Sequence, residues 1–346
     1  MSIYIHQTSC ISPQQTFGDV DIEQVHPSVN NQMRVIEPAY KNIPPGVLRR
    51  MSKNVKIAIA AALPLLHQKH VDGIITGTAN GGMEESIKFL NQVIEYDEGL
   101  LTPGDFVQST ANAVASQISL MTGNKNYNST HVHRGFSFEN ALLDAAMLVK
   151  ENPSQYFLVG GVDVISPYNY NIDTLAGCYK DEPVSNAVLY AANTKGTIAG
   201  EGAAMFIVSD AAAGAIAGIE AIEMITSKNT NELKQQLELF LEKHLKGEEL
   251  DLYLSGEDGD ERLKDYYLAA ESLINNNVTA ARFKHLTGDF ATVSALALWL
   301  GCYIIQNQVL PGDMVKRKGA LNGFKKVLIY NCYRQMQHSF ILVSKA

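Results

Sequence analysis

The predicted elements follow the same order in two halves of the chain. From Ile3 onward the sequence predicts a strand, a helix, a strand entering a Gly-rich loop, more helices, a turn into a buried helix, and paired strands. At Ala211 this order begins again. Strands alternating with helices indicate a largely parallel sheet covered on both faces, and an internal repeat constrains a fold more than any single motif does. The sequence therefore predicts a layered α/β/α/β/α body with halves at 1–210 and 211–346.

Helix and loop signals mark out the main elements. Ser52–Lys69 predicts a helix capped by Ser52, with Pro64 as a kink or break. Asp105–Met121, rich in Ala and Ser, predicts one central helix, and Ala291–Ile305 a long, nearly all-apolar one. Residues 166–196 carry prolines and several Asn, Tyr and Asp, which predicts a loop.

Residues 126–163 contain a strand, a sharp turn at Arg134–Gly135, an amphipathic helix and a buried strand ending in Gly160–Gly161. A strand that turns abruptly into a helix places one residue where unpaired N–H groups and the helix dipole favour an anion. Nucleophilic enzymes put Cys or Ser at such an elbow. The residue predicted at the tip here is Gly135, which has no side chain to react.

Composition excludes several classes of protein. A net charge of −8 and a pI near 5.6 argue against a general nucleic-acid binder. No apolar run reaches the roughly 18 residues that a membrane span needs, and MSIYIHQTSC lacks the pattern of a signal peptide. The four cysteines are scattered, which favours free thiols in a reducing compartment. We therefore expect a cytoplasmic protein, with no membrane or nucleic-acid partner and no cofactor.

The segment GTANGG (Gly77–Gly82) suggests a phosphate loop, but the Gly-Lys-Ser/Thr signature is missing and the spacing of GxGxxG fails. A tight backbone turn is the better interpretation of these glycines.

Five motifs, in order, resemble the thiolase-fold condensing enzymes, specifically the β-ketoacyl synthases. They are IYIHQTSCISPQQTFG, GTANGG, TPGDFVQSTANAVASQISLMTG, the pair FLVGGVD and GEGAAMFIV, and KHLTGDFATVSALALWLGCYIIQNQVLPG. The resemblance covers nearly the whole chain and implies a five-layered α/β/α/β/α fold of two similar halves. It also implies chemistry by a Cys nucleophile and two His residues, which condense a carrier-bound acyl chain with a decarboxylated malonyl unit.

The three catalytic positions of the family are all changed in this chain. Counting back from GGVD places the Cys position at Gly135, and the two His positions correspond to Gly256 and Asp289. The Lys of the second His segment is kept as Lys284. The family's C-terminal Gly-rich loop is replaced by CYRQMQHS (Cys332–Ser339). By the family's mechanism, no catalytic residue remains.

Other side chains are expected near the same site. The pocket candidates are His133, Arg134, Phe136, Lys284, His285 and Glu257, with His131 and Asp258 close by. A His–Asp pair with a water could act as a general base, but a polar plug in a vacated cavity is the simpler interpretation. The His131–His133 pair has no clear third ligand, so we expect no metal site.

Three functions remain open on the sequence. The resemblance favours a non-catalytic subunit similar to the chain-length factors, which pair with an active ketosynthase and an acyl carrier protein in fatty-acid, polyketide or aryl-polyene biosynthesis. In the family, the strand before the elbow pairs across a two-fold axis, so we expect a homodimer or a heterodimer with a catalytic ketosynthase. The alternatives are an acyltransferase or thioester hydrolase with altered chemistry, and an acyl-chain binding protein.

Overall fold

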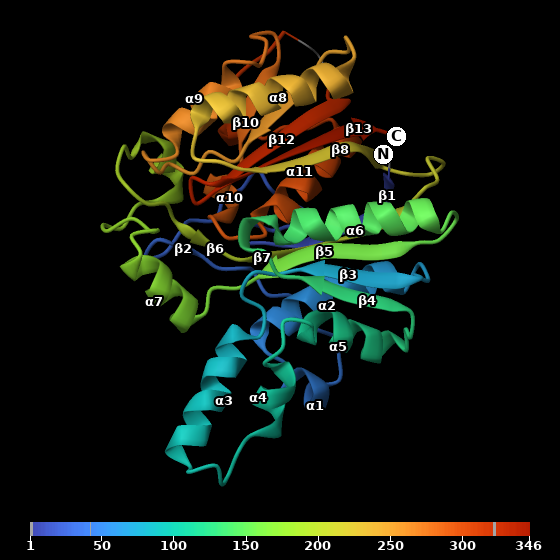
Figure 1. The fold of residues 1–346 in the computed structure, drawn as a ribbon, viewed down its shortest axis with the longest axis vertical. Helices are drawn as coiled ribbons and strands as arrows, with labels where there is room; N and C mark the ends of the chain where they lie inside the picture. Colours follow the sequence, from blue (N-terminus) through green and yellow to red (C-terminus); the bar gives the residue numbers. More distant parts are fainter. Residues whose placement is uncertain (1–2, 42, 321–322) are drawn as a thin grey trace.

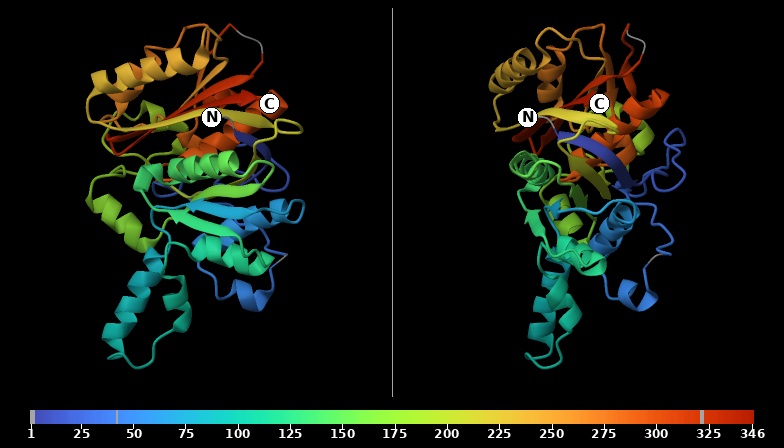
Figure 2. Two further views of the ribbon diagram at one scale, coloured as in Figure 1. Left: turned by 45° about the vertical axis from the view of Figure 1, so that its right-hand side comes forward. Right: turned by 90° about the vertical axis from the view of Figure 1, so that its right-hand side faces the viewer.

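The computed structural model describes residues 3–41, 43–320 and 323–346, and arranges them in five layers (Figure 1). Two half-sheets enclose a central layer of two helices, and two further helices cover the outer face of each half-sheet (Figures 1 and 2). The main helices are α2 (Lys53–Leu66) and α5 (Ala113–Thr122) in one outer layer, α6 (Ser137–Glu151) and α11 (Val293–Asn307) in the centre, and α8 (Thr230–Leu245) and α9 (Lys264–Glu271) in the other outer layer.

Eleven of the described strands form one continuous sheet, in the order β11-β10-β9-β12-β13-β8-β1-β7-β5-β3-β4. The first half contributes β1 (Ile3–Ile11), β3 (Gly73–Gly77), β4 (Tyr127–His131), β5 (Phe157–Asp163) and β7 (Gly202–Ser209). The second contributes β8 (Ala217–Thr226), β9 (Leu252–Ser255), β10 (Thr279–Arg282), β11 (Val315–Arg317), β12 (Lys326–Tyr333) and β13 (Gln337–Lys345).

The two half-sheets have the same topology. The order β1-β7-β5-β3-β4 corresponds to β8-β13-β12-β9-β10, and in both series the first two neighbouring pairs are antiparallel and the last two parallel. The halves join where β1 pairs with β8, over Ile3–Ile5 only. The predicted five-layered fold of two similar halves is thus confirmed, whereas the boundary between residues 210 and 211 stays a prediction.

The strands are apolar on both faces because each half-sheet is covered twice. Along β12, Val327 and Ile329 pack against the central helices, whereas Leu328 and Tyr330 pack under α8 and α9. Successive side chains of a strand point to opposite faces, so a sheet between two helical layers needs apolar residues at every position.

Smaller elements surround this body. They are β2 (Gln32–Met33) paired with β6 (Ala199–Gly200), α1 (Pro45–Leu48), α3 (Met83–Glu95), α4 (Pro103–Gln108), α7 (Pro167–Leu175), α10 (Lys284–Thr287), and the single-turn helices η1 (Arg134–Phe136), η2 (Asn186–Ala191) and η3 (Gly312–Met314). Helices α3 and α4 pack on each other and project from the body (Figures 1 and 2). Within the described residues, every helix is too short or too polar to cross a membrane.

The prediction of one helix at Asp105–Met121 is wrong, because the chain forms α4 and α5 with a break between them. Asn112, at the start of α5, is engaged by neighbouring side chains: its amide oxygen accepts from Thr130 Oγ1 at 2.6 Å and its amide nitrogen donates to Asn128 at 3.1 Å. Ser109 Oγ turns back to the carbonyl of Phe106 at 2.7 Å. Such side-chain bonds compete with helical ones and favour helix ends.

The prediction of a loop throughout 166–196 is also wrong. Helix α7 begins at Pro167, and Ser166 Oγ accepts the N–H of Asn169 at 3.1 Å. A Ser followed by Pro is a typical helix start, since Pro at the first position lacks an N–H that would be unpaired anyway.

Candidate functional site

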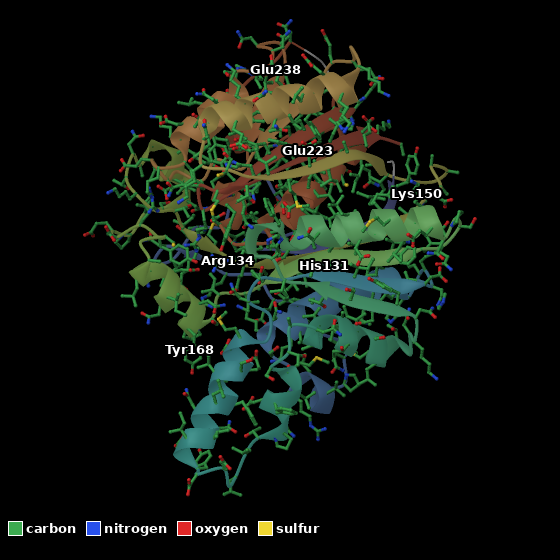
Figure 3. All side chains as sticks on the ribbon, viewed as in Figure 1. His131, Arg134, Lys150, Tyr168, Glu223 and Glu238 are labelled. Carbon is green, nitrogen blue, oxygen red and sulfur yellow. The ribbon has the colours of Figure 1, made fainter. Side chains whose placement is uncertain are left out.

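The predicted elbow forms between β4 and α6 (Figure 3). The chain reverses through η1, where Arg134 adopts a left-handed φ of 51°. Ser137 fixes the turn: its hydroxyl accepts the N–H of His133 at 2.8 Å and donates to the carbonyl of Arg134 at 2.8 Å. Gly135 therefore lies at the tip, as expected, just before the first turn of α6.

The space above Gly135 is filled by the C-terminal hairpin of β12 and β13. A Cβ placed on Gly135 would lie 2.4 Å from Cβ of Tyr333 and 2.6 Å from its Cγ. The N–H of Gly135 donates to Gln337 Oε1 at 2.9 Å, and Gln337 Nε2 donates to the carbonyl of His133 at 3.4 Å. Tyr333 thus occupies the space where a nucleophilic side chain would stand. The amide of Gln337 binds the N–H of Gly135, which could otherwise bind an anion.

Gly256, the predicted position of the first His, directly follows β9. Its N–H donates to the carbonyl of Tyr330 at 2.8 Å, and a Cβ on Gly256 would lie 2.6 Å from Asn331 Oδ1. The neighbouring strand β12 thus occupies the volume that a side chain at this position would need.

Asp289, the predicted position of the second His, is half of a buried ion pair. Lys284 Nζ lies 2.7 Å from Asp289 Oδ1, although the angle between the groups is poor for a hydrogen bond. Burial alone would lower the pKa of Lys284, but the charges of Asp289 and Asp258 outweigh it and raise the pKa. Burial raises the pKa of both carboxyls, that of Asp258 to about 7. One ammonium faces two carboxyls, and the raised pKa values favour keeping one of these protonated at neutral pH.

The ion pair and the hairpin lie within electrostatic reach of each other. Burial raises the pKa of Tyr333, and the charge of Asp289 raises it further. The hairpin turn carries Arg334, whose guanidinium pairs with Asp173 of α7 at 3.0 Å. The structure therefore brings Gly135, Tyr333, Lys284 and Asp289 into one region.

The side chains of other expected pocket residues are exposed or have other partners. His133 and Arg134 are exposed, and His133 Nδ1 is 3.0 Å from the amide of Asn140. Glu257 pairs with Lys316 at 2.7 Å and lies 3.5 Å from Arg282. These contacts leave His133 and Glu257 with partners of their own.

The remaining candidates are either buried in the interior or bonded to a neighbour near the surface. Phe136 is buried. His285 is buried against the hydroxyl of Tyr190 at 3.1 Å, and burial lowers its pKa to about 4. His131 bonds Asp144 at 2.8 Å near the surface (Figure 3).

The Gly-rich turn at 77–82 binds a carboxylate of the chain itself. Asp163, at the end of β5, accepts the N–H groups of Ala79 and Asn80, both at 2.9 Å, and the hydroxyls of Thr78 and Thr292, both at 2.9 Å. The donors that could hold a phosphate are used internally, as expected for a tight structural turn.

Sequence reasoning missed two residues of this region. Tyr333 contacts Gly135 although the two residues are far apart in the sequence, and no local pattern indicates that contact. Glu139, in the first turn of α6, is fully buried, and its Oε1 accepts from Ser339 Oγ at 2.7 Å. Burial raises the pKa of Glu139 to about 7. A glutamate on an otherwise apolar helix face was the only signal available for it.

The three buried thiols offer no substitute nucleophile. Cys10, Cys302 and Cys332 are buried, and burial raises the pKa of Cys10 and of Cys302 to about 12. Such thiols are not ionised at neutral pH, and the thiolate is the reactive form. Across the described parts of the chain, no group of three His, Cys, Asp or Glu residues could hold a metal ion.

Comparison with solved structures agrees with the architecture. The chain is similar to the ishigamide ketosynthase/chain length factor, with 15% identity, a TM-score of 0.76, and coverage of 100% of this chain and 99% of that one. It is also similar to ketosynthase ApeO in complex with its chain length factor ApeC from Xenorhabdus doucetiae, with 13% identity, a TM-score of 0.76 and coverage of 100% and 98%. For AntDE:AntF, a type II acyl-carrier protein in complex with its ketosynthase, the values are 12%, 0.78, and 99% of each chain. At these identities the likeness shows the fold.

Among curated proteins, no sequence matches this chain significantly. A family model does match, and its description is the N-terminal domain of β-ketoacyl synthase, aligned to residues 23–247. The resemblance inferred from the motifs is thereby confirmed, and the chain belongs to the β-ketoacyl synthase family.

Proposed function

We propose that this chain is a non-catalytic, ketosynthase-like subunit that acts with an active ketosynthase and an acyl carrier protein, as chain-length factors do. The pathway would be a fatty-acid, polyketide or aryl-polyene type of biosynthesis. One observation carries the proposal: Gly135 stands at the tip of the elbow, and Tyr333 fills the space where a nucleophilic side chain would be.

The rest of the region supports the same conclusion. The two positions of the family's histidines hold Gly256 and Asp289, and Asp289 is paired with the buried Lys284. The carboxyl of Asp289 is held by Lys284, so it does not offer a thioester carbonyl the N–H that a neutral imidazole would donate. The fold is kept while the groups needed for condensation are absent.

The surface supports a partner subunit. Strand β4 ends the sheet, and an unpaired strand edge invites pairing with another chain. The projecting α3–α4 hairpin exposes large apolar side chains: Ile94 is 81% exposed, Leu100 86% and Val107 67%. Apolar surface of this extent is typical of protein interfaces. Two of the similar solved structures are described as pairs of a ketosynthase and a chain length factor, which favours a ketosynthase as the partner.

The contacts do not favour the alternative of a thioester hydrolase. A general base made from His133 and Asp289 would need the two groups to share a water, but His133 is exposed and bonded to Asn140. Asp289 is buried against Lys284. No specific observation favours the alternative of an acyl-chain binding protein either.

Native mass spectrometry of the purified chain tests the proposal. The chain is measured alone, with an acyl-loaded carrier protein, and with ketosynthases from the same source. We expect no covalent acyl adduct on this chain, and a mixed dimer when the matching ketosynthase is added. A ketosynthase variant without its nucleophilic Cys is the control, because it leaves no acceptor thiol in the partner. An adduct on this chain, or turnover of the loaded carrier by it alone, would contradict the proposal.

A further inference from the structure

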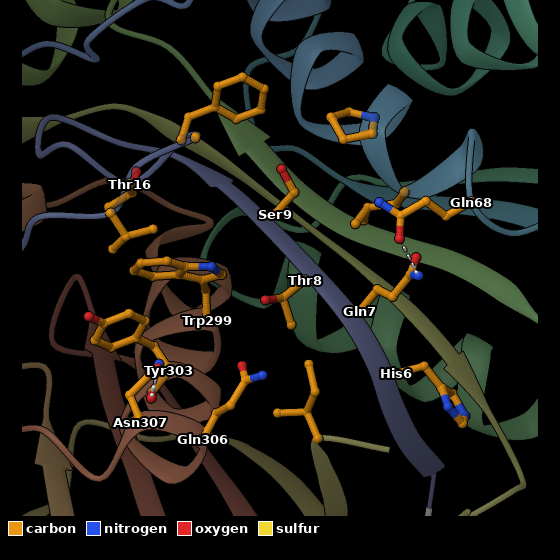
Figure 4. A pocket seen from close by; sticks show the side chains of 16 residues that line it. His6, Gln7, Thr8, Ser9, Thr16, Gln68, Trp299, Tyr303, Gln306 and Asn307 are labelled. Carbon is orange, nitrogen blue, oxygen red and sulfur yellow. Dashed lines mark hydrogen bonds between the residues drawn. The ribbon is translucent and has the colours of Figure 1, made fainter. Parts of the chain in front are cut away.

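A groove of about 710 Å³ runs beside β1 between α2 and α11 (Figure 4). It has no residue in common with the region around Gly135. Its lining includes four consecutive residues of β1, which are His6, Gln7, Thr8 and Ser9. Because successive side chains of a strand point to opposite faces, a hollow that touches all four opens on the edge of the strand and not on one face.

The side chains confirm this placement. Gln7 turns toward the C-terminal end of α2, and its Nε2 donates to Oε1 of Gln68, just beyond that helix, at 2.9 Å. Thr8 turns the other way, toward Trp299 and Gln306 of α11 (Figure 4). The groove therefore wraps around the edge of β1, with one helix on each side.

The backbone of β1 lacks a neighbouring strand along this edge. Strand β7 pairs with β1 from Tyr4 to Ile11, whereas β8 pairs with it only from Ile3 to Ile5. The last bond from the β8 side is Ile216 N–H to the carbonyl of Ile5, at 2.7 Å.

Beyond that point, Thr16 Oγ1 donates to the carbonyl of Cys10 at 3.2 Å, which shows that this carbonyl points away from β7. Backbone groups two residues apart on a strand point the same way, so the N–H and C=O of Thr8 also face the groove. Within the described residues, no hydrogen bond to them from that side is found.

The lining is neutral and rich in hydrogen-bonding groups. It contains no Lys, Arg, Asp or Glu, and its amides come from Gln7, Gln68, Gln306 and Asn307. Burial, together with the charge of Lys69, lowers the pKa of His6, so this ring is neutral at pH 7. Gln7 Oε1 is buried without a hydrogen-bond partner. An occupant of this groove should therefore be uncharged and able to form hydrogen bonds.

One end of the groove adjoins an apolar pocket of about 400 Å³, and the two share Phe17 and Pro64. Ala60 and Leu63 of α2 also line this pocket. A chain lying in the groove could place an apolar side chain there.

We propose that the groove binds an extended, uncharged peptide segment of a partner protein as an added strand on the open edge of β1. Main-chain bonds to Thr8 supply affinity, and an apolar residue beside Phe17 supplies specificity, as in other cases of strand addition. The open edge from His6 to Ser9, the residues of β1 that line the groove, accommodates about four residues, or roughly 13 Å at the rise of a strand. A neutral lining disfavours an acidic carrier protein or a phosphate ligand.

The test uses hydrogen exchange of the full-length chain. The probes are a pool of acetylated, amidated pentapeptides of uncharged residues with Leu or Phe at one end, and each active member is then tested alone. We expect binding to slow amide exchange in the segment of residues 6–9. The same peptide, N-methylated at its central residues, should bind at least tenfold more weakly, because it cannot pair with a strand edge. Binding that ignores N-methylation, or no protection by any member of the pool, would overturn the proposal.

A groove-filling variant provides the second readout. Gln306→Trp places a large ring in the hollow and should weaken peptide binding at least tenfold. Gln235→Trp, on the exposed face of α8, is the matched control and should bind as the unchanged chain does. Equal binding by both variants would refute the site. If maltotriose, and not the peptides, slowed amide exchange of residues 6–9, the groove would be assigned to a sugar and the proposal of a peptide ligand would likewise be refuted.

Discussion

At the scale of single residues, the elbow depends on Gly135 for space and not for backbone freedom. The left-handed φ belongs to Arg134, at 51°, so a larger residue at position 135 would suffer no strain in φ. Its Cβ would instead lie 2.4 Å from Cβ of Tyr333 and 2.6 Å from Cγ of the ring. The two residues form a matched pair, in which a missing side chain on α6 accommodates a large one from the C-terminal hairpin.

Substitution at this contact should show strong coupling. We expect Gly135→Ala to lower the free energy of unfolding by about 2 kcal/mol, because overpacking a core costs roughly 1–3 kcal/mol. In a Tyr333→Gly background the same change should cost well under 1 kcal/mol, since Cβ of Tyr333, the nearest atom at 2.4 Å, is removed together with the ring. Chemical denaturation of the four proteins measures the coupling. Gly301→Ala in α11 is the control, because a Cβ there lies 3.6 Å from its nearest neighbour. Additive effects at Gly135 and Tyr333 would show that the two do not touch.

Glu139 should make stability depend on pH. Its folded-state pKa is raised to about 7 from an ordinary 4.5, so between these values the folded chain holds a proton that the unfolded chain has lost. The contribution of Glu139 to the free energy of unfolding is therefore fully present below pH 4.5 and is lost as the pH rises through about 7. The loss amounts to roughly 3 kcal/mol. Glu139→Gln should remove this loss. Its stability relative to that of the unchanged chain should therefore be greater at pH 8 than at pH 5.

Denaturation midpoints at pH 5 and pH 8 provide the measurement for Glu139. Glu151→Gln, at the exposed end of the same helix, is the control. Asp258 contributes a loss in the same direction, since burial raises its pKa to about 7, so some dependence on pH should remain in Glu139→Gln. An unchanged slope in that variant would contradict the assignment.

At the scale of elements, α10 and the turn after it connect the two halves. The N–H of Asp289 donates to the carbonyl of Ile198 at 2.8 Å, and its carbonyl accepts the N–H of Gly200 in β6 at 2.9 Å. Its side chain pairs with Lys284, which has no exposed surface. The backbone of Asp289 thus binds the turn to the first half, and its carboxylate binds the turn to Lys284 of α10.

Removing one partner of this ion pair should be far worse than removing both. We expect Asp289→Ala to destabilise the chain by about 3 kcal/mol or more, because it leaves a buried ammonium without its nearest carboxylate. The double variant Lys284→Met with Asp289→Leu should lose clearly less than Asp289→Ala alone. Glu84→Ala, which breaks the exposed pair with Lys88 at 2.7 Å, is the control and should cost under about 1 kcal/mol. Thermal unfolding of these variants measures the difference.

The sequence predicts what depends on local pattern and misses what depends on distant contacts. Ser52 caps α2 as predicted, with Oγ accepting the N–H of Val55 at 3.4 Å, because capping involves only neighbouring residues. The break before α5 depends on bonds from Asn112 to Thr130 and Asn128, which no helical pattern contains. Tyr333 over Gly135 is the extreme case, since a repeat of strands and helices predicts the elbow but not what covers it.

At the scale of the whole molecule, the sheet ends at β4. The carbonyl of His131 accepts the N–H of Thr78 at 3.1 Å, so it faces toward β3. By alternation, the backbone groups of Asn128 and Thr130 face the open edge. This is the edge at which we place the pairing with a ketosynthase.

Removing one N–H from that edge should weaken the dimer. We expect Asn128→Pro to raise the dissociation constant of the mixed dimer at least tenfold, because Pro cannot donate to a strand ladder. Asn128→Ala is the matched control: it loses the same bond from the amide to the carbonyl of Ala115 but keeps its backbone N–H, so it should dimerise normally. Sedimentation velocity over a range of concentrations measures both. Equal dimerisation of the two variants would place the interface elsewhere.

The position of β1 has a consequence for how the chain is made. It leaves the ribosome well before its neighbours β7 and β8, which begin only at Gly202 and Ala217. At roughly 5–20 residues per second, synthesis of the intervening segment takes on the order of 10 s or longer. During that time Ile3, Ile5 and Ile11, all buried in the finished protein, have no strand to pair with. The nascent β1 segment is therefore a natural substrate for chaperones that hold unpaired apolar strands, and the two halves of the sheet can join only after β8 has been made.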